Sequence, residues 1–223
     1  MTKAEIHLSR HADLFKQTEP LLIESTGLLS NTGADMKQAA TLTERQLKLV
    51  LAYCATRQHA ARDRAIIMMS FLAGLRAKEI AALDLSDVVD TEGNIRAEFV
   101  LTPEQTKGRK ARRVFVSQRL QKELSVYISQ RKTRPKCQAL FPTQKDQAFS
   151  SNSLCQLFLK IYAEAGITGA SSHSGRRSLL TSLAAKGVSV RVLQEIAGHS
   201  SIAITQRYID VNDHQIRAAI ELG

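Results

Sequence analysis

Residues 197–209 read AGHSSIAITQRYI. In this stretch a glycine precedes His199, and Tyr208 follows nine positions later, at the end of a segment whose apolar residues have helical spacing. A tyrosine at the end of an apolar helix is most often a packing residue, because its ring is large and hydrophobic. The same phenol can act as a nucleophile when basic groups surround it. The rest of the sequence has to decide between these two interpretations.

The composition indicates a polyanion as the partner. The 223 residues include 31 Lys and Arg against 21 Asp and Glu, which gives a formal net charge of +10 at pH 7. Such an excess of positive charge favours nucleic acid binding. The three cysteines have no Cys-x-x-Cys spacing, so we predict neither a disulfide framework nor a metal site.

Two features predict a cytoplasmic protein without a membrane partner. The longest apolar run, residues 65–75, is far shorter than the roughly 20 residues that a membrane-spanning helix requires. The N-terminus has no basic segment followed by an apolar stretch and a small-residue cleavage site, which a secretion signal would have.

The apolar periodicity predicts mainly helices. Thr41 and Glu44 have the spacing of a capping box, and apolar residues repeat at helical intervals after them, up to Cys54. Gly74 is predicted to end a second helix over 61–73. Further helices are predicted over residues 76–83, 174–186, 189–197 and 201–209, and around the apolar positions of 120–128 and 154–162.

Residues 95–101 and 112–116 favour β-strands, and the polar stretch TPEQTKGRKA joins them. We therefore predict a mainly α fold with a small antiparallel β-sheet, of the α+β class. Residues 1–40 include the turn-rich stretch STGLLSNTGAD and are predicted to form an N-terminal extension or linker ahead of a domain over 41–223.

Two arginines have the setting of phosphate ligands. Cleaving a DNA phosphodiester without a metal requires cations on the non-bridging oxygens, a nucleophile and a proton for the leaving oxygen. Arg76 in GLRAKEI and Arg176 in HSGRRSL each lie beside a glycine near a predicted helix start. The planar guanidinium matches a phosphate edge, and helix N-termini also favour anions.

Four segments, GLRAKEIAAL, TKGRKARRV, HSGRR and AGHSSIAITQRYI, resemble in order and spacing the successive motifs of the tyrosine recombinase, or phage integrase, family. The resemblance covers about residues 41–210. It implies the catalytic-domain fold of that family and the activity of a site-specific recombinase. Such an enzyme cleaves and rejoins DNA strands through a 3′-phosphotyrosine intermediate, in integration, excision, inversion or resolution.

The resemblance implies that Tyr208 is the nucleophile and that Lys107 is the general acid for the leaving 5′ oxygen, with Lys110 as the alternative. The full set of catalytic residues that it implies is Arg76, Glu79, Lys107, His173, Arg176, His199 and Tyr208. Arg76 and Arg176 would bind the scissile phosphate, and Glu79 would steady Arg76. Because a phosphotyrosine ester conserves the energy of the broken bond, we expect no ATP, metal or other cofactor, and the sequence has no Walker motif.

Further basic residues are predicted to contact DNA: Lys78, Arg109, Lys110, Arg112, Arg113 and Arg177. Two positions depart from the family pattern, since Arg177 stands where many members have histidine and Ala197 where leucine is usual. We expect Arg177 to contact phosphate or to form a buried ion pair. Ala197 only reduces apolar volume.

Double-stranded DNA is the main expected partner, with a homotetramer on two paired sites and a monomer in free solution. Residues 1–40 are too few for the separate DNA-binding domain that family members usually carry. The layout resembles short members such as the invertases of fimbrial promoters, so an accessory DNA-binding protein is also expected. The apolar stripe within 212–223 is predicted to dock on a neighbouring protomer, and folding back on its own domain is the alternative.

Two other functions remain open. Residues 183–209 have the helix, glycine turn and helix of a helix-turn-helix motif, so the chain could be a regulator that binds DNA without cleaving it. That interpretation leaves GLRAKEI and the basic hairpin unexplained. A type IB topoisomerase uses chemistry similar to that of the recombinases to relax supercoils. The sequence does not name the target DNA.

Overall fold

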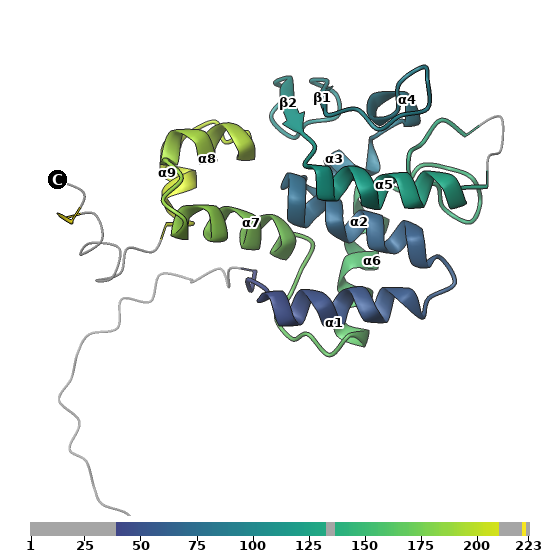
Figure 1. Cartoon of the computed structure of the whole chain (residues 1–223), viewed down its shortest axis with the longest axis horizontal. Helices are drawn as coiled ribbons and strands as arrows, with labels where there is room; N and C mark the ends of the chain where they lie inside the picture. The colour runs from purple at the N-terminus through teal and green to yellow at the C-terminus, as the bar shows by residue number, and fades with distance from the viewer. Residues whose placement is uncertain (1–38, 133–136, 210–219, 222–223) are drawn as a thin grey trace, which may run out of the picture. The chain divides into compact units, whose positions relative to one another are not determined.

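The computed structural model describes residues 39–132, 137–209 and 220–221 (Figure 1). The predicted fold class is confirmed, because the described residues are mainly helical with one two-stranded antiparallel sheet. The elements are α1 (Glu44–Ala55), α2 (Ala60–Ala73), α3 (Ala77–Ala81), α4 (Leu85–Val88), β1 (Glu98–Leu101), β2 (Arg112–Phe115), α5 (Gln118–Gln130), α6 (Ser151–Glu164), α7 (Ser174–Ala185), α8 (Val190–Ala197) and α9 (Ile202–Gln206).

Helix α2 lies at the centre of the core. Four consecutive residues of this helix, 66–69, are fully buried, so it is apolar on all sides rather than amphipathic. It packs against α1, α5 and α7, and Figure 1 shows it between α5 and α1. Gly74 ends α2 as predicted, in the left-handed conformation with φ of 63°. The C-terminal end of this rigid helix is where the candidate site is built.

Helix α1 begins two residues later than the predicted capping box. Thr43, not Thr41, is the N-cap: its hydroxyl accepts a hydrogen bond from the Gln46 N–H at 3.2 Å, and the Gln46 side chain accepts one from the Thr43 N–H at 2.9 Å. The predicted apolar face is confirmed, since Leu47, Val50, Leu51 and Cys54 are the buried residues of α1.

The sheet is shorter than the sequence predicts. β1 pairs with β2 from Glu98 opposite Phe115 to Leu101 opposite Arg112, and Ile95 makes only an isolated bridge with Val89. The short helix α4 was not predicted. Helix α9 ends at Gln206 instead of residue 209, which places Tyr208 in the turn that follows it.

Some predictions concern residues outside the described ranges. The boundary between residues 1–40 and 41–223 is not tested, and most of the stripe within 212–223 lies outside the described residues. Across the described ranges no helix combines the length and hydrophobicity needed to cross a membrane.

Gly175, in the first turn of α7, sets the distance between α7 and α2. A Cβ atom at this position would lie 2.6 Å from Ser70 Oγ and 2.8 Å from Phe71 Cδ2, closer than atoms pack. The two helices therefore approach as closely as only glycine permits. Because Arg176 follows directly, this contact also fixes where that side chain starts.

We expect Gly175→Ala to lower the melting temperature. Overpacking a dense core costs about 1–3 kcal/mol, which outweighs the gain of about 1 kcal/mol in helix propensity. Thermal unfolding followed by circular dichroism measures the effect. Gly108→Ala is the control, since a Cβ atom there meets nothing within 4 Å. Equal melting temperatures for the two variants would contradict the close α2–α7 contact.

Candidate active site

Arg176 lies at the centre of the candidate site, where the ends of α2, α7 and α8 meet. Its side chain is 3% exposed. One terminal nitrogen, Nη1, donates to the Gly74 carbonyl at 2.6 Å, and Nη2 donates to the Ala197 carbonyl. Burial, and then the charge of Arg76, lower the pKa of Arg176, although a guanidinium stays charged in proteins. The guanidinium of Arg176 is thus held by two backbone carbonyls at a place where the nearby negative charge does not balance the positive charge of the arginines.

Glu79 is the buried carboxylate of the site. It is fully buried; Oε1 accepts from Arg76 Nη1, and Oε2 accepts from the Arg76 N–H and from Arg112 Nη2, each at 2.8 Å. Burial raises the pKa of Glu79, but Arg112 and Arg76 outweigh it and hold the pKa below the usual range. Glu79 is therefore ionised at neutral pH. The structure brings Glu79 and Arg76 together, as the sequence predicted.

Both predicted histidines lie among these arginines. His199 follows α8, and its Nδ1 lies 2.9 Å from Thr205 Oγ1. Burial, then Arg176, Arg76 and Arg112, lower the pKa of His199 to about 4. His173 precedes α7, and burial, then Arg176, Arg76 and Lys107, lower its pKa as well. Both imidazoles are therefore neutral at pH 7 and able to accept a proton.

Tyr208 packs and also faces basic groups. Its ring rests on the small apolar cluster formed by Leu180, Leu193 and Ala197. It stacks on the His199 ring, with 5.6 Å between centroids and 18° between planes. The Arg177 guanidinium lies 5.7 Å from the centre of the same ring, within the range of a cation–π contact. Tyr208 therefore packs on an apolar cluster and also lies beside the basic groups that the nucleophile interpretation requires.

Lys107 is exposed in the loop between β1 and β2. This loop is held to α3, because Lys78 Nζ donates to the Thr106 carbonyl at 3.2 Å. The Thr106 hydroxyl in turn accepts from the Lys110 N–H at 3.2 Å. The charge of Lys107 adds to the burial and the arginines that lower the pKa of His173, so the loop brings this lysine towards the other site residues.

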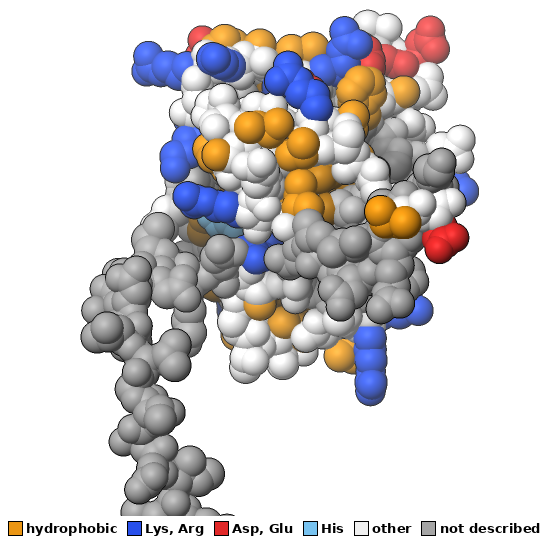
Figure 2. Space-filling model, turned by 90° about the vertical axis from the view of Figure 1, so that its left-hand side faces the viewer, with side chains coloured by type: hydrophobic (Ala, Val, Ile, Leu, Met, Phe, Trp, Pro, Cys, Tyr) orange, Lys and Arg blue, Asp and Glu red, His pale blue; other side chains and the backbone are white. Residues whose placement is uncertain are grey.

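The other predicted DNA-binding residues divide into two groups. Arg109, Lys110 and Arg113 are exposed in the hairpin. Arg112 is only 10% exposed, and both of its terminal nitrogens bind groups inside the protein. On the face shown in Figure 2, Lys and Arg side chains gather along the upper and left-hand parts, where a histidine is also visible.

Thr205 is a site residue that the sequence analysis missed. It is fully buried, whereas Ile202 and Ile204 on the same helix are 42% and 38% exposed. The apolar pattern of 201–209 thus pointed to the wrong face of α9. A polar residue that is buried needs a hydrogen-bond partner, and His199 supplies it.

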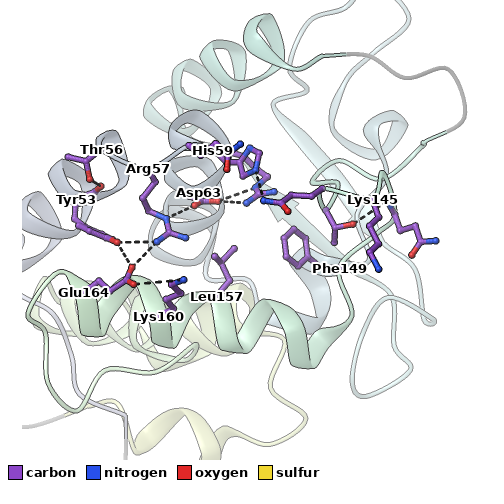
Figure 3. Close-up of a pocket in the computed structure, with 15 residues that line it drawn as sticks. Tyr53, Thr56, Arg57, His59, Asp63, Lys145, Phe149, Leu157, Lys160 and Glu164 are labelled. Atoms are coloured by element: carbon purple, nitrogen blue, oxygen red, sulfur yellow. Dashed lines mark hydrogen bonds and ion pairs between the residues drawn. The ribbon is translucent and has the colours of Figure 1, made fainter.

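Apart from the candidate site, a pocket of about 790 Å³ lies at the N-terminal end of α2 (Figure 3). We refer to it as the second pocket. Arg57 bridges two carboxylates there, at 2.7 Å from Asp63 and 2.9 Å from Glu164. The Tyr53 hydroxyl also donates to Glu164. These charges pair with one another, and the residues predicted to be catalytic or to bind DNA do not line this pocket.

The motifs of the chain match a known family. The family model described as "Phage integrase family" matches residues 40–215. The chain belongs to the phage integrase family. It is therefore a tyrosine-type site-specific recombinase by descent, like the tyrosine recombinase XerD of Neisseria meningitidis, with which it is 30% identical over 204 residues. That match covers 88% of this chain and 67% of XerD.

Solved recombinase structures share the fold. The crystal structure of XerA recombinase matches with a TM-score of 0.66 and 25% identity, over 82% of this chain and 65% of that one. The XerH site-specific recombinase, bound to palindromic difH substrate, matches with a TM-score of 0.65 and 23% identity, over 86% and 55%. This tyrosine recombinase thus spans about two thirds of XerD and XerA, and the likeness to XerH concerns the fold alone.

The cluster of arginines around His199 predicts that an anion raises its pKa. Burial and the nearby cations disfavour the charged imidazolium, so His199 should stay neutral down to about pH 5. Inorganic phosphate bound between the arginines should move the pKa of His199 upwards. Nuclear magnetic resonance of ring-labelled histidine measures both values. His59, at the second pocket, is the internal control that phosphate should leave unchanged. Titration of His199 near the ordinary value of about 6.5 would contradict this electrostatic account.

Proposed function

We propose that this recombinase cleaves and rejoins double-stranded DNA through a covalent bond between Tyr208 and a 3′ phosphate. One observation supports this most strongly. Arg76 and Arg176 come from different parts of the chain, yet Arg176 donates to the carbonyl of Gly74, two residues before Arg76, and both arginines lower the pKa of His173 and His199. Gathering like charges is unfavourable unless an anion binds among them. A DNA phosphate is an anion of suitable shape.

Phosphate binding falls to the two arginines. Arg176 uses one N–H of each terminal nitrogen on a backbone carbonyl, and a guanidinium has five N–H groups in total. The remaining N–H groups, with those of Arg76, can donate to the non-bridging oxygens. Because the donors are held in place before the reaction, they stabilise the charge that develops in the transition state without rearrangement.

The phenol oxygen of Tyr208 attacks the phosphorus atom, and the bond between phosphorus and the 5′ oxygen breaks. The phenol proton passes to a neutral imidazole, for which His173 and His199 are the candidates, since both rings are uncharged at neutral pH. Attack by a 5′ hydroxyl of another strand reverses these steps and rejoins the DNA.

Lys107 is the proposed donor of the proton that the leaving 5′ oxygen takes up. The contact of Lys78 with Thr106 holds the loop near α3, and the Lys107 charge acts on His173. Lys110 remains the alternative in the same loop.

Exchange between two duplexes joins four DNA ends, so we propose that four copies act on two paired sites and that the free chain is a monomer. Double-stranded DNA as the partner is supported by the net charge of +10. A non-cleaving regulator would have no use for the neutral His199 beside Tyr208. A topoisomerase would share this histidine, and the similarity to XerD favours recombination.

We expect Tyr208→Phe to abolish covalent attachment to DNA and to leave DNA binding largely intact, because only the attacking oxygen is lost. The wild type and the variant are incubated with sheared genomic DNA of the source organism and denatured in detergent. The DNA that stays bound to protein is then recovered and sequenced, which also identifies the target duplex. An adduct formed by the phenylalanine variant would refute Tyr208 as the nucleophile.

We expect Lys107→Ala to slow cleavage of the recovered duplex by at least about 100-fold, in the range of general acid catalysis. Cleavage should recover when sulfur replaces the 5′ bridging oxygen, since a thiolate leaves without a proton. Lys110→Ala is the matched control, with a lysine lost from the same loop. Recovery by sulfur in the Lys110 variant alone would assign the proton to Lys110 instead.

A further inference from the structure

Arg112 differs from the other cations of the hairpin because it faces the protein interior. Along β2, Arg112 and Val114 are turned inwards and alternate with the exposed Arg113 and Phe115. The Arg112 side chain is 10% exposed, against 61% for that of Arg113. A buried arginine has to bind acceptors inside the protein, and these acceptors belong to the catalytic elements.

The Arg112 guanidinium joins two parts of the candidate site. Nη2 donates to Glu79 Oε2 at 2.8 Å, and Nη1 donates to the Ile196 carbonyl at 3.0 Å. The other oxygen of Glu79 binds Arg76. One side chain of β2 therefore contacts both α3, which carries the first phosphate arginine, and the end of α8, which His199 follows.

The end of α8 depends on two arginines for its hydrogen bonds. The last four carbonyls of a helix have no partner within the helix. The first two here, of Gln194 and Glu195, accept from the N–H groups of the turn that contains His199. The last two accept from side chains, that of Ile196 from Arg112 and that of Ala197 from Arg176. The negative end of the helix dipole favours both cations.

Gly198 completes this contact sterically. It caps α8 in the left-handed conformation, with φ of 58°. A Cβ atom there would lie 2.5 Å from Arg112 Cδ and 3.2 Å from Arg112 Nε. The aliphatic stem of Arg112 thus lies against the residue that precedes His199, and only glycine leaves room for it.

We propose that Arg112 is a positioning residue that fixes His199 and Arg76 relative to each other by holding the end of α8 against Glu79. This role rests on the proposed function and replaces, for Arg112, the phosphate contact predicted from the sequence. It requires both terminal nitrogens, because each contacts a different element.

The first test separates positioning from DNA binding. We expect Arg112→Met to slow adduct formation on the recovered duplex about 100-fold, the order of loss for a misplaced group, with DNA affinity within about threefold of wild type. Arg112→Lys reaches one acceptor only and should regain part of the rate. Arg113→Met removes an exposed charge of the same strand and should instead weaken binding and its salt dependence. Weakened binding in Arg112→Met that matches Arg113→Met would overturn the proposal.

The second test separates positioning from a merely structural role. The charged groups facing Glu79 are Arg76 of α3, Arg112 of β2 and Arg176 of α7. Arg112 lowers the pKa of both Glu79 and His199, so its loss raises both pKa values. Because both groups then take up a proton at a higher pH, the variant should lose activity earlier than the wild type as the pH is lowered. The control is Arg119→Met, on the surface of α5, with an unchanged pH profile. A lower rate with the wild-type profile would overturn the proposal.

Gly198→Ala tests the same contact and leaves the charge of Arg112 in place. We expect it to slow cleavage strongly in the wild type and only slightly in an Arg112→Ala background, because the clash with the arginine stem is then gone. The left-handed backbone strain is common to both backgrounds and cancels in the comparison. Equal effects in the two backgrounds would show that the side chains do not act through this contact.

Failure of the proposed function can be told apart from failure of the role proposed for Arg112. If the wild type binds DNA and forms no adduct, the proposed function fails, and the role of Arg112 is read from the histidine titration in protein without DNA. Arg112→Met should raise the pKa of His199, whereas Arg119→Met should not. An unchanged His199 in Arg112→Met would overturn the proposal whatever the activity of the chain.

Discussion

A single buried carboxylate, that of Glu79, sets the arrangement of the site. It contacts Arg76 and Arg112 directly, and its charge also favours the cation of Arg176. One negative charge does not balance three positive ones, so the site has an excess of positive charge in a place that water reaches poorly. Burial, and then this excess of positive charge, lower the pKa values of His173 and His199. The scissile phosphate is the group that would balance it.

Close approach of the backbone makes this arrangement possible. Gly175 lets α7 approach α2, and Gly198 lets the end of α8 approach Arg112. Gly74 turns the chain at the end of α2 and presents a carbonyl to Arg176. Two carbonyls at the end of α8 complete the set of acceptors. The cations are thus held partly by backbone dipoles, which favour them and, unlike carboxylates, do not cancel their charge for DNA.

The sequence predicted the helices with strong apolar periodicity and the residues within recognisable motifs. It failed where tertiary contacts decide. In α9 the isoleucines are partly exposed and Thr205 is buried, since the hydrogen bond to His199 outweighs the apolar pattern. Arg112 looked like one more cation in a basic run. Strand alternation could have revealed it, because Val114, two residues later on β2, is an inward-facing apolar residue.

Tyr208 illustrates why a packing role and a catalytic role suit the same residue. A nucleophile has to be held in one orientation, and in the turn after α9 the Tyr208 N–H donates to the Thr205 carbonyl at 3.0 Å. The apolar cluster of α7 and α8 and the stacked ring of His199 hold the phenol ring in place. Since Arg112 and Arg176 hold the end of α8, which precedes His199, the orientation of the tyrosine follows from the same contacts that build the phosphate site.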